Sequence, residues 1–455
     1  MKSIIASALR LIPAALLLLA SAPLHSKVLY ISPTGSDTAP GTITAPMATL
    51  PAAYARMEGG DTIYVRGGTY RVTDEQIMKV DPTYAYVFAL EKGGTPEHRT
   101  AIMGYPGERP VFDFSALQYD GRHRFSGFLL GADNLHLRNF DIVGVPVRLK
   151  GHTQSECVSA RKGSNCIVEN LAMHDGMAIG YYQTAGSGNL VLNCDAYNNY
   201  DDYSEGEYGG NVDGFGFHLG NPRAEGNVIR NCRAWRNSDD GFDLINCKAP
   251  IEFDHCWAFY NGFKPTADPT DTTTFQSAGD GNGFKAGGYG MKPGKTKCPA
   301  VCPEHYIHNC VAYRNKANGI YANHHLGGCR WVNNTAWDNR ANYNMVNRKS
   351  EREVVDVPGY GHYLEGNVSY TFTDTVRGGH LVNCDPVRST VVNNTFPAPS
   401  SGEAPVEVTA EMFVSTDPAL LFLPRDADGN LPVIDFLRAA PSSPLATRHL
   451  GWSEK

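Results

Sequence analysis

Three aspartates lie within five positions of the segment NSDDGFDL, residues 237–244, and a fourth, Asp213, stands in the related phrase NVDGFGF. An Asp-Gly pair is ordinary in a polar turn. Two carboxylates about 5 Å apart, however, repel by roughly 3 kcal/mol at an effective dielectric constant of about 20. If the fold gathers Asp213, Asp239, Asp240 and Asp243, the group needs added protons or a bound cation. Ligands that are all oxygen favour Ca2+ over zinc or copper, so the pattern predicts a calcium site.

A lysine occupies the corresponding place in a third phrase, GDGNGFKAGG. Lys285 lies two residues after a glycine, as Asp243 does in NSDDGFDL and Tyr321 does in ANGIYA. Its ammonium would offset part of the negative charge of the aspartates, and a structural salt bridge is its simplest role. These phrases can act together only if the fold brings them together.

The elements that position these residues are indicated by a repeat. The phrase NCDAYNN at 193 recurs as NCRAWRN at 231, HCWAFYN at 255, NCVAYRN at 309 and NNTAWDN at 333, with weaker copies at 169 and 366. An interval of 24 residues occurs three times, and the other intervals are longer. The intervening runs are rich in Val, Ile, Tyr and Trp and too short for helices. Repeated short strands predict an all-β, single-domain parallel β-solenoid.

The first two letters of the phrase predict two columns along such a stack. The asparagines at 193, 231, 309 and 333 are expected to hydrogen-bond to one another through their amides. The cysteines Cys194, Cys232, Cys256 and Cys310 are expected to point inward as packing residues rather than to form a metal site.

Stacking turns sequence register into distance, because equivalent positions on adjacent turns lie about 4.8 Å apart. Asp213 and Asp240 then share one column with the asparagines at 282 and 318, and Asp243, Lys285 and Tyr321 share another. Insertions before residues 213 and 282 are expected to emerge as long loops on the same edge. A third insertion brings Lys292. Loops along one edge commonly build binding walls, and a groove beside a cation suits a polyanionic chain.

Composition limits the setting of this domain. Residues 1–26 resemble a signal peptide, with Lys2 and Arg10 around an apolar run too short to span a bilayer comfortably. The mature chain would carry the remaining 38 of 40 basic residues against 47 acidic ones, which disfavours nucleic-acid binding. We therefore expect an exported, soluble monomer from a bacterium, secreted or periplasmic, without a membrane anchor.

The cysteine content is compatible with export. Eleven cysteines suggest disulfides, and the odd number leaves at least one unpaired within a monomer. Cys298 and Cys302 could close a local loop, whereas zinc is the weaker interpretation of their spacing because no partner pair is present.

In their order, NVDGFGFHLG, NSDDGFDL, CWAFYNG and GDGNGFKAGG resemble polysaccharide lyase family 9, the right-handed parallel β-helix pectate lyases and their relatives. The similarity covers nearly all of residues 27–455, with an N-terminal cap over about 27–100 and a C-terminal cap over about 400–455. It implies calcium at Asp213, Asp239, Asp240 and Asp243, and a catalytic base at Lys285. The implied reaction is calcium-dependent β-elimination in an acidic pectic polysaccharide, with best activity at alkaline pH.

Some positions depart from the family pattern. His218 stands where a lysine is expected, and His324 and His325 replace a more usual Asp-Gln-Asn run. With Tyr321 and Lys292 they are candidate sugar contacts, and a histidine or solvent could protonate the leaving oxygen. The substrate is either homogalacturonan (pectate) or the rhamnogalacturonan I backbone.

Three other functions compete with a lyase. A polygalacturonase-like hydrolase would use paired aspartates without Lys285 or calcium. A uronan epimerase would abstract the same proton without shortening the chain. A non-catalytic polysaccharide-binding solenoid would require neither step.

Overall fold

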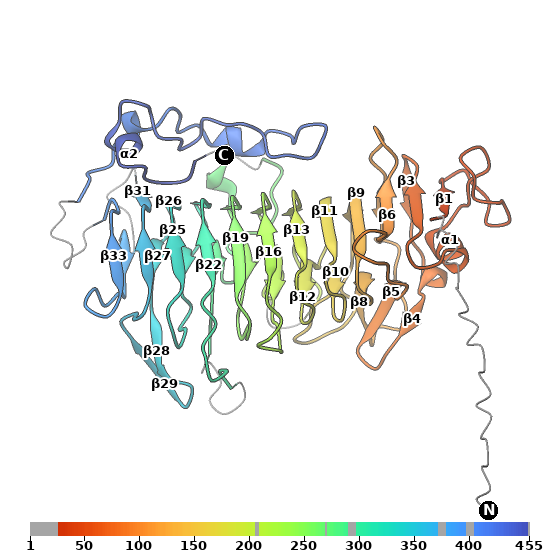
Figure 1. Cartoon of the computed structure of the whole chain (residues 1–455), viewed down its shortest axis with the longest axis horizontal. Helices are drawn as coiled ribbons and strands as arrows, with labels where there is room; N and C mark the ends of the chain where they lie inside the picture. The colour runs from red at the N-terminus through yellow and green to blue at the C-terminus, as the bar shows by residue number, and fades with distance from the viewer. Residues whose placement is uncertain are drawn as a thin grey trace, which may run out of the picture.

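The computed structural model describes residues 26–204, 209–268, 271–289, 297–371, 379–396 and 405–453. They form coils stacked along one long axis (Figure 1). Apart from residue 26, the predicted signal peptide lies outside these ranges, as does Lys292. Among the described residues, no helix has the length and apolar character needed to cross a membrane.

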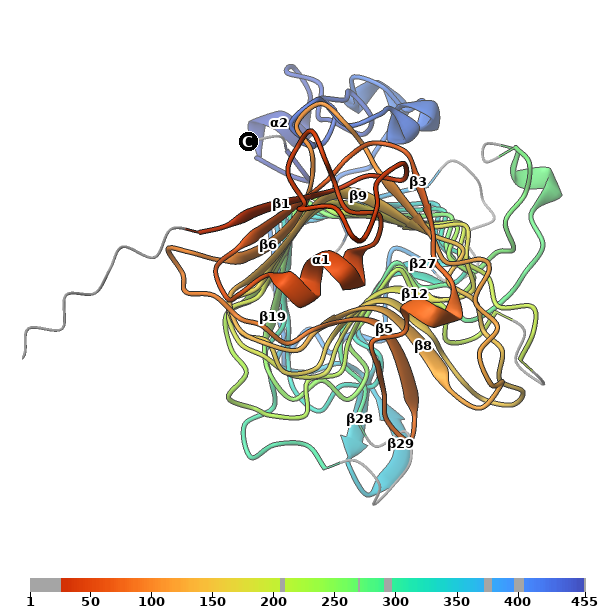
Figure 2. The ribbon, with the colours of Figure 1, turned by 90° about the vertical axis from the view of Figure 1, so that its right-hand side faces the viewer.

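The coils are built from parallel strands in two sheets, and a view along the axis shows the strands superimposed around a closed interior (Figure 2). Sheet 1 contains β4 (Lys79–Val80), β5 (Tyr84–Leu90), β8 (Arg124–Leu130), β10 (Glu156–Ala160), β12 (Ile179–Gln183), β15 (Phe215–Phe217), β18 (Phe242–Asp243), β21 (Phe284–Lys285), β24 (Asn318–Tyr321), β27 (Ala341–Asn344) and β32 (Leu381–Val382). Sheet 2 bends into two faces because its long strands β9 (Leu135–Val143) and β11 (Ile167–His174) belong to both.

The remaining strands of sheet 2 divide between those two faces. Face 2a contains β1 (Val28–Ile31), β2 (Thr62–Val65), β6 (Thr100–Gly104), β13 (Leu190–Leu192), β16 (Asn227–Arg230), β19 (Ile251–Asp254), β22 (Tyr306–His308), β25 (Arg330–Val332), β30 (Tyr363–Glu365) and β33 (Thr390–Val392). Face 2b contains β3 (Thr69–Arg71), β7 (Val111–Asp113), β14 (Asp195–Tyr197), β17 (Arg233–Trp235), β20 (Trp257–Phe259), β23 (Val311–Tyr313), β26 (Thr335–Trp337) and β31 (Val368–Tyr370). An antiparallel hairpin, β28 (Asn347–Ser350) and β29 (Glu353–Val357), projects from the stack.

Single left-handed residues turn the chain at the corners of each coil. The first asparagine of the repeated phrase sits between faces 2a and 2b, with φ of 56° at Asn193, 54° at Asn231 and 52° at Asn309. Asparagine adopts this conformation more readily than most residues. The predicted amide column is formed only in part, because Asn231 donates to Asn193 but His255 interrupts the column. The repeat selects asparagine there mainly for its backbone.

The continuous amide ladder is instead made by the last asparagine of the phrase, inside the stack. Each member donates through Nδ2 to Oδ1 of the next, at 2.9–3.2 Å. We call this set the interior ladder: Asn199, Asn237, Asn261, Asn315, Asn339 and Asn342. Its members also bond to backbone groups; for example, Asn261 donates to the carbonyl of Ala234.

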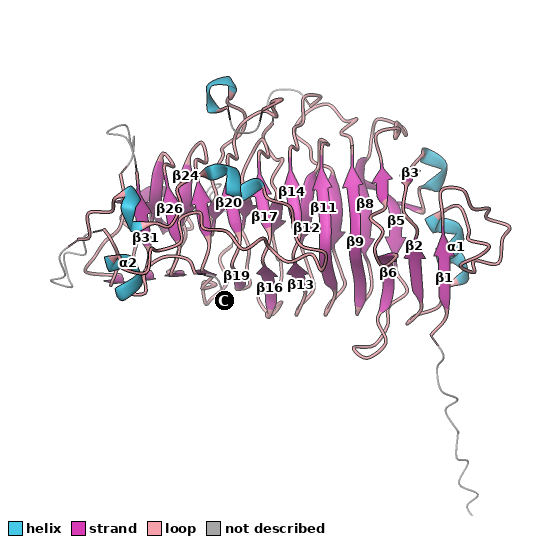
Figure 3. Ribbon diagram, turned by 90° about the horizontal axis from the view of Figure 1, so that it is seen from above, coloured by secondary structure: helices cyan, strands magenta, loops and turns pink. Residues whose placement is uncertain are grey.

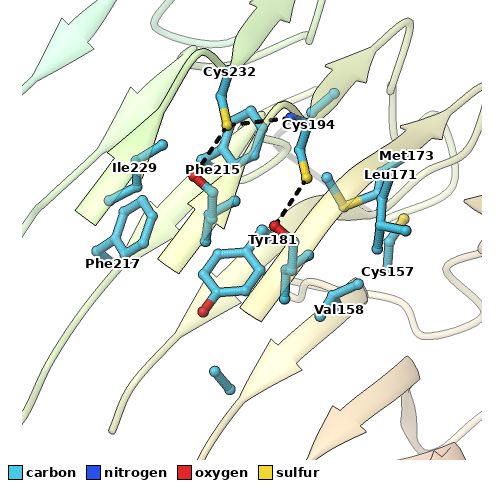
Figure 4. Packing of buried hydrophobic residues seen from close by; sticks show 14 of the residues in the cluster. Cys157, Val158, Leu171, Met173, Tyr181, Cys194, Phe215, Phe217, Ile229 and Cys232 are labelled. Atoms are coloured by element: carbon cyan, nitrogen blue, oxygen red, sulfur yellow. Dashed lines mark hydrogen bonds between the residues drawn. The ribbon is translucent and has the colours of Figure 1, made fainter. Parts of the chain in front are cut away.

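Glycine in the DGF-type phrases allows these coils to approach one another. A Cβ atom at Gly241 would lie 2.8 Å from the carbonyl oxygen of Gly283 and 2.9 Å from Nδ2 of Asn261. The predicted cysteine column is confirmed as packing: Cys194 and Cys232 lie among buried apolar side chains (Figure 4). All eleven cysteines are free thiols. Cys298 and Cys302 hydrogen-bond to each other without the expected disulfide.

The two ends of the chain cover different parts of the stack. Helix α1 (Leu50–Arg56) lies across the N-terminal opening of the coil and buries Leu50, Ala53 and Tyr54 (Figure 2). The segment 405–453 runs along the outside of face 2b rather than only across the C-terminal end (Figure 3). It contains α2 (Pro444–Thr447) and short 3-10 turns at 410–412 and 418–422; two more lie at 74–76 and 272–274.

Candidate active site

The predicted register of the charged columns is confirmed. Strand β15 pairs with β18 so that Gly216 faces Asp243, and β18 pairs with β21 so that Asp243 faces Lys285. Strand β24 continues the column with Tyr321. Residues that are far apart in sequence therefore become neighbours on the outer surface of sheet 1.

Three of the four predicted ligands meet at one point. Asp213, Asp240 and Asp243 each place a carboxylate oxygen within 4.8 Å of the others, and all three residues are buried. Oδ1 of Asp213 accepts the backbone N–H of Asp240, and Oδ1 of Asp240 accepts two hydrogen bonds from Asn282. Oδ2 of Asp240 is buried, and its close partner is the ammonium of Lys285 at 2.9 Å.

Asp239 belongs to an overlapping cluster that the sequence did not reveal in full. Its carboxylate lies with those of Asp240 and Asp280 within 4.8 Å, while its two oxygens accept the backbone N–H groups of Asn211 and Asp280. Asp280 comes from the long loop before β21 and its side chain is 71% exposed. The only sequence signal for Asp280 was its place in the phrase GDGNGF.

Without added positive charge, these buried carboxylates repel one another and disfavour ionisation. Burial raises the pKa of Asp213 well above its usual range, and repulsion from the other aspartates raises it further. Burial also raises the pKa of Asp240 to about 7, with Lys285 opposing the shift and Asp239 and Asp243 adding to it. A raised carboxyl pKa means that the surroundings disfavour the ionised form. The site therefore favours anything that brings positive charge to these oxygens.

Lys285 supplies one such charge. Nζ lies 2.9 Å from Oδ2 of Asp240, 3.3 Å from Oδ2 of Asp243 and 3.6 Å from Oδ2 of Asp280. Burial alone would lower the pKa of Lys285, but the surrounding carboxylates outweigh it and hold that pKa well above its usual value. One ammonium thus faces several carboxylates and is locked as a cation by them.

Tyrosine–histidine pairs flank the charged centre on both sides. Tyr182 hydrogen-bonds to Nδ1 of His218 at 2.8 Å, and Nε2 of His218 lies 4.0 Å from Oδ2 of Asp243. On the other side, Oη of Tyr321 lies 2.9 Å from Nε2 of His324. His218 and Tyr321 thus lie where substrate contact was predicted.

The second pair is anchored by the hairpin. Nδ1 of His324 lies 2.7 Å from Asp356 of β29, which also pairs with Arg348 of β28 at 2.6 Å. With Nδ1 protonated against Asp356, Nε2 accepts the phenolic proton of Tyr321. Burial lowers the pKa of His324.

The structure does not bring every predicted contact to the groove. His325 is fully buried, and Nε2 lies 2.8 Å from the carbonyl of Pro303, beside the thiol of Cys302. Burial lowers the pKa of His325 to about 4. Although it is adjacent to His324, it points into the stack, so a sugar contact by His325 is not supported. Lys292 lies outside the described residues.

The charged centre opens into a cavity of about 710 Å3. Its floor is formed by sheet 1, including Asp213, Asp243 and Lys285, and its walls come from the two long loops through Asn211 and Gly279. The expectation that these insertions form walls beside the charged columns is confirmed. Lys285 thus lies at the wall of an accessible cavity and not in the closed interior of the stack.

Known proteins share this architecture. Residues 29–357 match the model of the "Pel9A-like, right handed beta helix region" family. Pectate lyase L of Dickeya chrysanthemi is 30% identical over 92% of this chain and 85% of its own length. A solved rhamnogalacturonan lyase is 40% identical, with a TM-score of 0.86 over 94% of this chain and 99% of that chain. Pectate lyase Pel9A is 28% identical, with a TM-score of 0.67 over 92% of this chain and 90% of that one.

The match to the family model covers most of the chain, and the relatives align along almost all of it. Their similarity extends through the strands that carry the charged columns. The chain is therefore a polysaccharide lyase that belongs to the Pel9A-like right-handed β-helix family.

Proposed function

We propose that this lyase cleaves galacturonate-containing pectin by calcium-dependent β-elimination, with Lys285 as the general base. The observation that carries the proposal is the buried excess of carboxylates around one lysine. A structural salt bridge would require one or two carboxylates, whereas Asp213, Asp240 and Asp243 cluster with Asp239 and Asp280 alongside. Polar groups gathered at this density in a cavity are typical of a functional site.

The residues fit a calcium ion. The donors are carboxylates only, as hard divalent cations prefer, and the single ammonium of Lys285 is shared between Oδ2 of Asp240 and Oδ2 of Asp243. The raised pKa values of Asp213 and Asp240 show that positive charge is in deficit. We assign Asp213, Asp239, Asp240 and Asp243 as the residues that would hold the ion.

Lys285 would take the proton from the ring carbon beside the substrate carboxylate. The electron pair of that C–H bond forms the new C=C bond as the glycosidic C–O bond breaks, and the leaving oxygen takes a proton from solvent. When bound, calcium supplies positive charge that neutralises the aspartates, draws in the substrate carboxylate and lowers the Lys285 pKa toward the working range. The amine must be neutral to act, so activity should rise into alkaline pH.

Neighbouring groups would hold the sugar. His218 presents a buried Nε2 without a hydrogen-bond partner among the described residues, directed at the cavity beside Asp243. Tyr321 donates its proton to His324, so its oxygen is left to accept from a sugar hydroxyl. Both side chains bracket Lys285 along the groove.

The rhamnogalacturonan I backbone is the favoured substrate over homogalacturonan. The solved rhamnogalacturonan lyase is 40% identical to this chain, whereas the solved pectate lyase Pel9A is 28% identical, with comparable coverage. Export through the leader at residues 1–26 and a monomeric state complete the proposal, since an acidic plant polymer is met outside the cell.

The test follows ultraviolet absorbance of unsaturated chain ends from rhamnogalacturonan I and from polygalacturonate, with calcium or with a chelator. We expect calcium-dependent product, and loss of product in Lys285→Ala with the thermal transition kept. Lys162→Ala, which removes an exposed lysine, serves as the matched control.

Each alternative gives a different result. Chain shortening without ultraviolet absorbance indicates a hydrolase. Changed sugar stereochemistry at constant chain length indicates an epimerase. Binding alone indicates a non-catalytic solenoid, and full turnover by Lys285→Ala would remove Lys285 as the base.

A further inference from the structure

The groove continues past Lys285 toward the C-terminal end of the stack. A second cavity of about 610 Å3 shares Asp280 and Lys316 with the cavity at the active site. It extends across the next coil, where sheet 1 contributes Asn318 and Tyr321, and reaches Arg340. The two cavities together form one path along the axis of the stack.

Arg340 has an unmet positive charge on this path. It is exposed, and its guanidinium makes no ion pair or hydrogen bond to any residue within the described ranges. Nearby cations differ: Arg314 pairs with Asp338 at 2.7 Å, and Nζ of Lys316 bonds to the carbonyls of Ala278 and Gly279. Arg340 is thus the groove cation that is left to bind a ligand anion.

Strand register fixes the separation of Arg340 from Lys285 along the axis of the stack, and across the sheet it places Arg340 four positions before the column of Lys285. It precedes Ala341, which pairs with Asn318 on the coil before it, and β24 pairs with β21, which carries Lys285. Two coil steps amount to roughly 10 Å along the axis, which is about the length of a disaccharide. The coil in between presents the amide of Asn318, the phenol of Tyr321 and Lys316, whose ammonium is held by the carbonyls of Ala278 and Gly279.

We propose that Arg340 binds the carboxylate of a uronate one disaccharide away from the sugar attacked at Lys285. The groove then offers a carboxylate-binding centre at Lys285 with the proposed calcium, an intermediate coil whose Lys316 is already held by two carbonyls, and, at Arg340, a guanidinium without a partner among the described residues. This order suits a backbone of alternating acidic and neutral sugars. A guanidinium suits the task because it grips a carboxylate through two parallel hydrogen bonds. In homogalacturonan the intermediate sugar would also be charged, and its carboxylate would meet Asp280 beside Lys316, whose ammonium already donates to two carbonyls. This inference rests on the proposed function and narrows its substrate to the alternating backbone.

The test compares Arg340→Gln with wild type on alternating galacturonate–rhamnose oligosaccharides. We expect KM to rise roughly tenfold with kcat within about twofold, because a charged hydrogen bond to a non-reacting sugar is lost. Arg340→Lys should recover part of the loss. Arg71→Gln, which removes an exposed arginine on face 2b, is the matched control and should leave KM unchanged.

A second substrate shows whether Arg340 reads the carboxylate. With the distal uronate reduced to its neutral alcohol, wild type should lose about the same factor in KM, and Arg340→Gln should lose nothing more. Equal losses for both enzymes, or an unchanged KM for Arg340→Gln, would overturn the proposal. If wild type forms no unsaturated product at all, the proposed function fails. Calorimetric binding of the same two oligosaccharides to wild type and Arg340→Gln then still decides whether Arg340 binds the carboxylate.

Discussion

Two of the polar ladders that run along this stack behave differently. The interior ladder consists only of asparagines, and each one between its two ends donates to one neighbour and accepts from the other. The ladder on sheet 1 continues in the same way from Asn318 through Asn282, but it ends in Asp240 and Asp213. An amide has donors and acceptors, whereas an ionised carboxylate only accepts.

The difference shows how one coil geometry produces both structure and chemistry. In the interior ladder every hydrogen-bonding group finds a partner, so the column is neutral and complete. On sheet 1 the exchange of two amides for carboxylates leaves negative charge that neighbouring residues do not fully offset. The pKa of Asp240, raised to about 7, records that shortage. The candidate catalytic residues lie where carboxylates leave the ladder on sheet 1 incomplete.

Asp240→Asn should remove this difference most directly, because it completes the ladder on sheet 1. The amide keeps the acceptor for Asn282 but removes a ligand of the proposed ion. We expect turnover to fall at least about 100-fold, a size typical of losing an electrostatic group at a reaction centre, and calcium to raise the melting temperature less than in wild type. In chelator the variant should be at least as stable as wild type.

The reverse exchange, Asn282→Asp, is its control. It extends the carboxylates by one more coil and should lower the melting temperature in chelator. An unchanged calcium response in Asp240→Asn would contradict the assignment of Asp240 as a ligand.

The interior ladder is expected to carry stability without chemistry. Asn261→Ala leaves partners on two coils unsatisfied, and each unpaired buried polar group costs about 1–3 kcal/mol. We expect urea denaturation to show a loss of that order. Calcium affinity and the kcat of the folded fraction should remain those of wild type, and loss of calcium binding at unchanged stability would contradict this division of roles.

Removing calcium should make the stability of the protein depend on pH through the aspartates. The folded-state pKa of Asp240 lies above its unfolded value, so the folded protein binds the extra proton between about pH 4 and 7. In chelator this site's contribution to stability is present at low pH and is lost as the pH rises through about 7. Thermal unfolding with and without calcium at pH 5 and pH 8 should therefore show a larger calcium effect at pH 8. The opposite order would exclude these carboxylates as the source.

The smallest effect is expected at the edge of the sheet 1 ladder. Asp356→Asn weakens the hold on His324 and thus on Tyr321, without touching the aspartates. We expect activity to fall by several-fold, mainly through KM, with calcium affinity unchanged. Glu353→Gln on the same strand is the control, because within the described residues the Glu353 side chain pairs only with exposed Lys349 and with half-buried Ser350. A loss of activity larger than that of Asp240→Asn would mean that the hydrogen bonds from Asp356 through His324 to Tyr321, and not the carboxylate cluster, dominate the site.

The features that could be predicted from the sequence are those that follow the repeat. The repeated phrases predicted the columns of Asp240 and Lys285 despite the insertions between them, because strand pairing advances register by whole coils. Asp280 and Asp356 were missed because a loop and a hairpin deliver them, and neither follows the period. The amide column predicted at the first asparagine of the phrase forms only in part, and the interior ladder at the last asparagine was not predicted. A corner residue and an inward residue are six positions apart and chemically identical.

The segment 405–453 carries a consequence for how the protein is made. It covers Trp257, Tyr313 and Trp337 on face 2b, and Arg425 within it pairs with Asp195. Coils that form one after another during synthesis therefore leave the aromatic side chains of face 2b uncovered until residues 405–453 have been made. A nascent or truncated chain would present those side chains to its neighbours, so completion of the chain is itself a safeguard against aggregation.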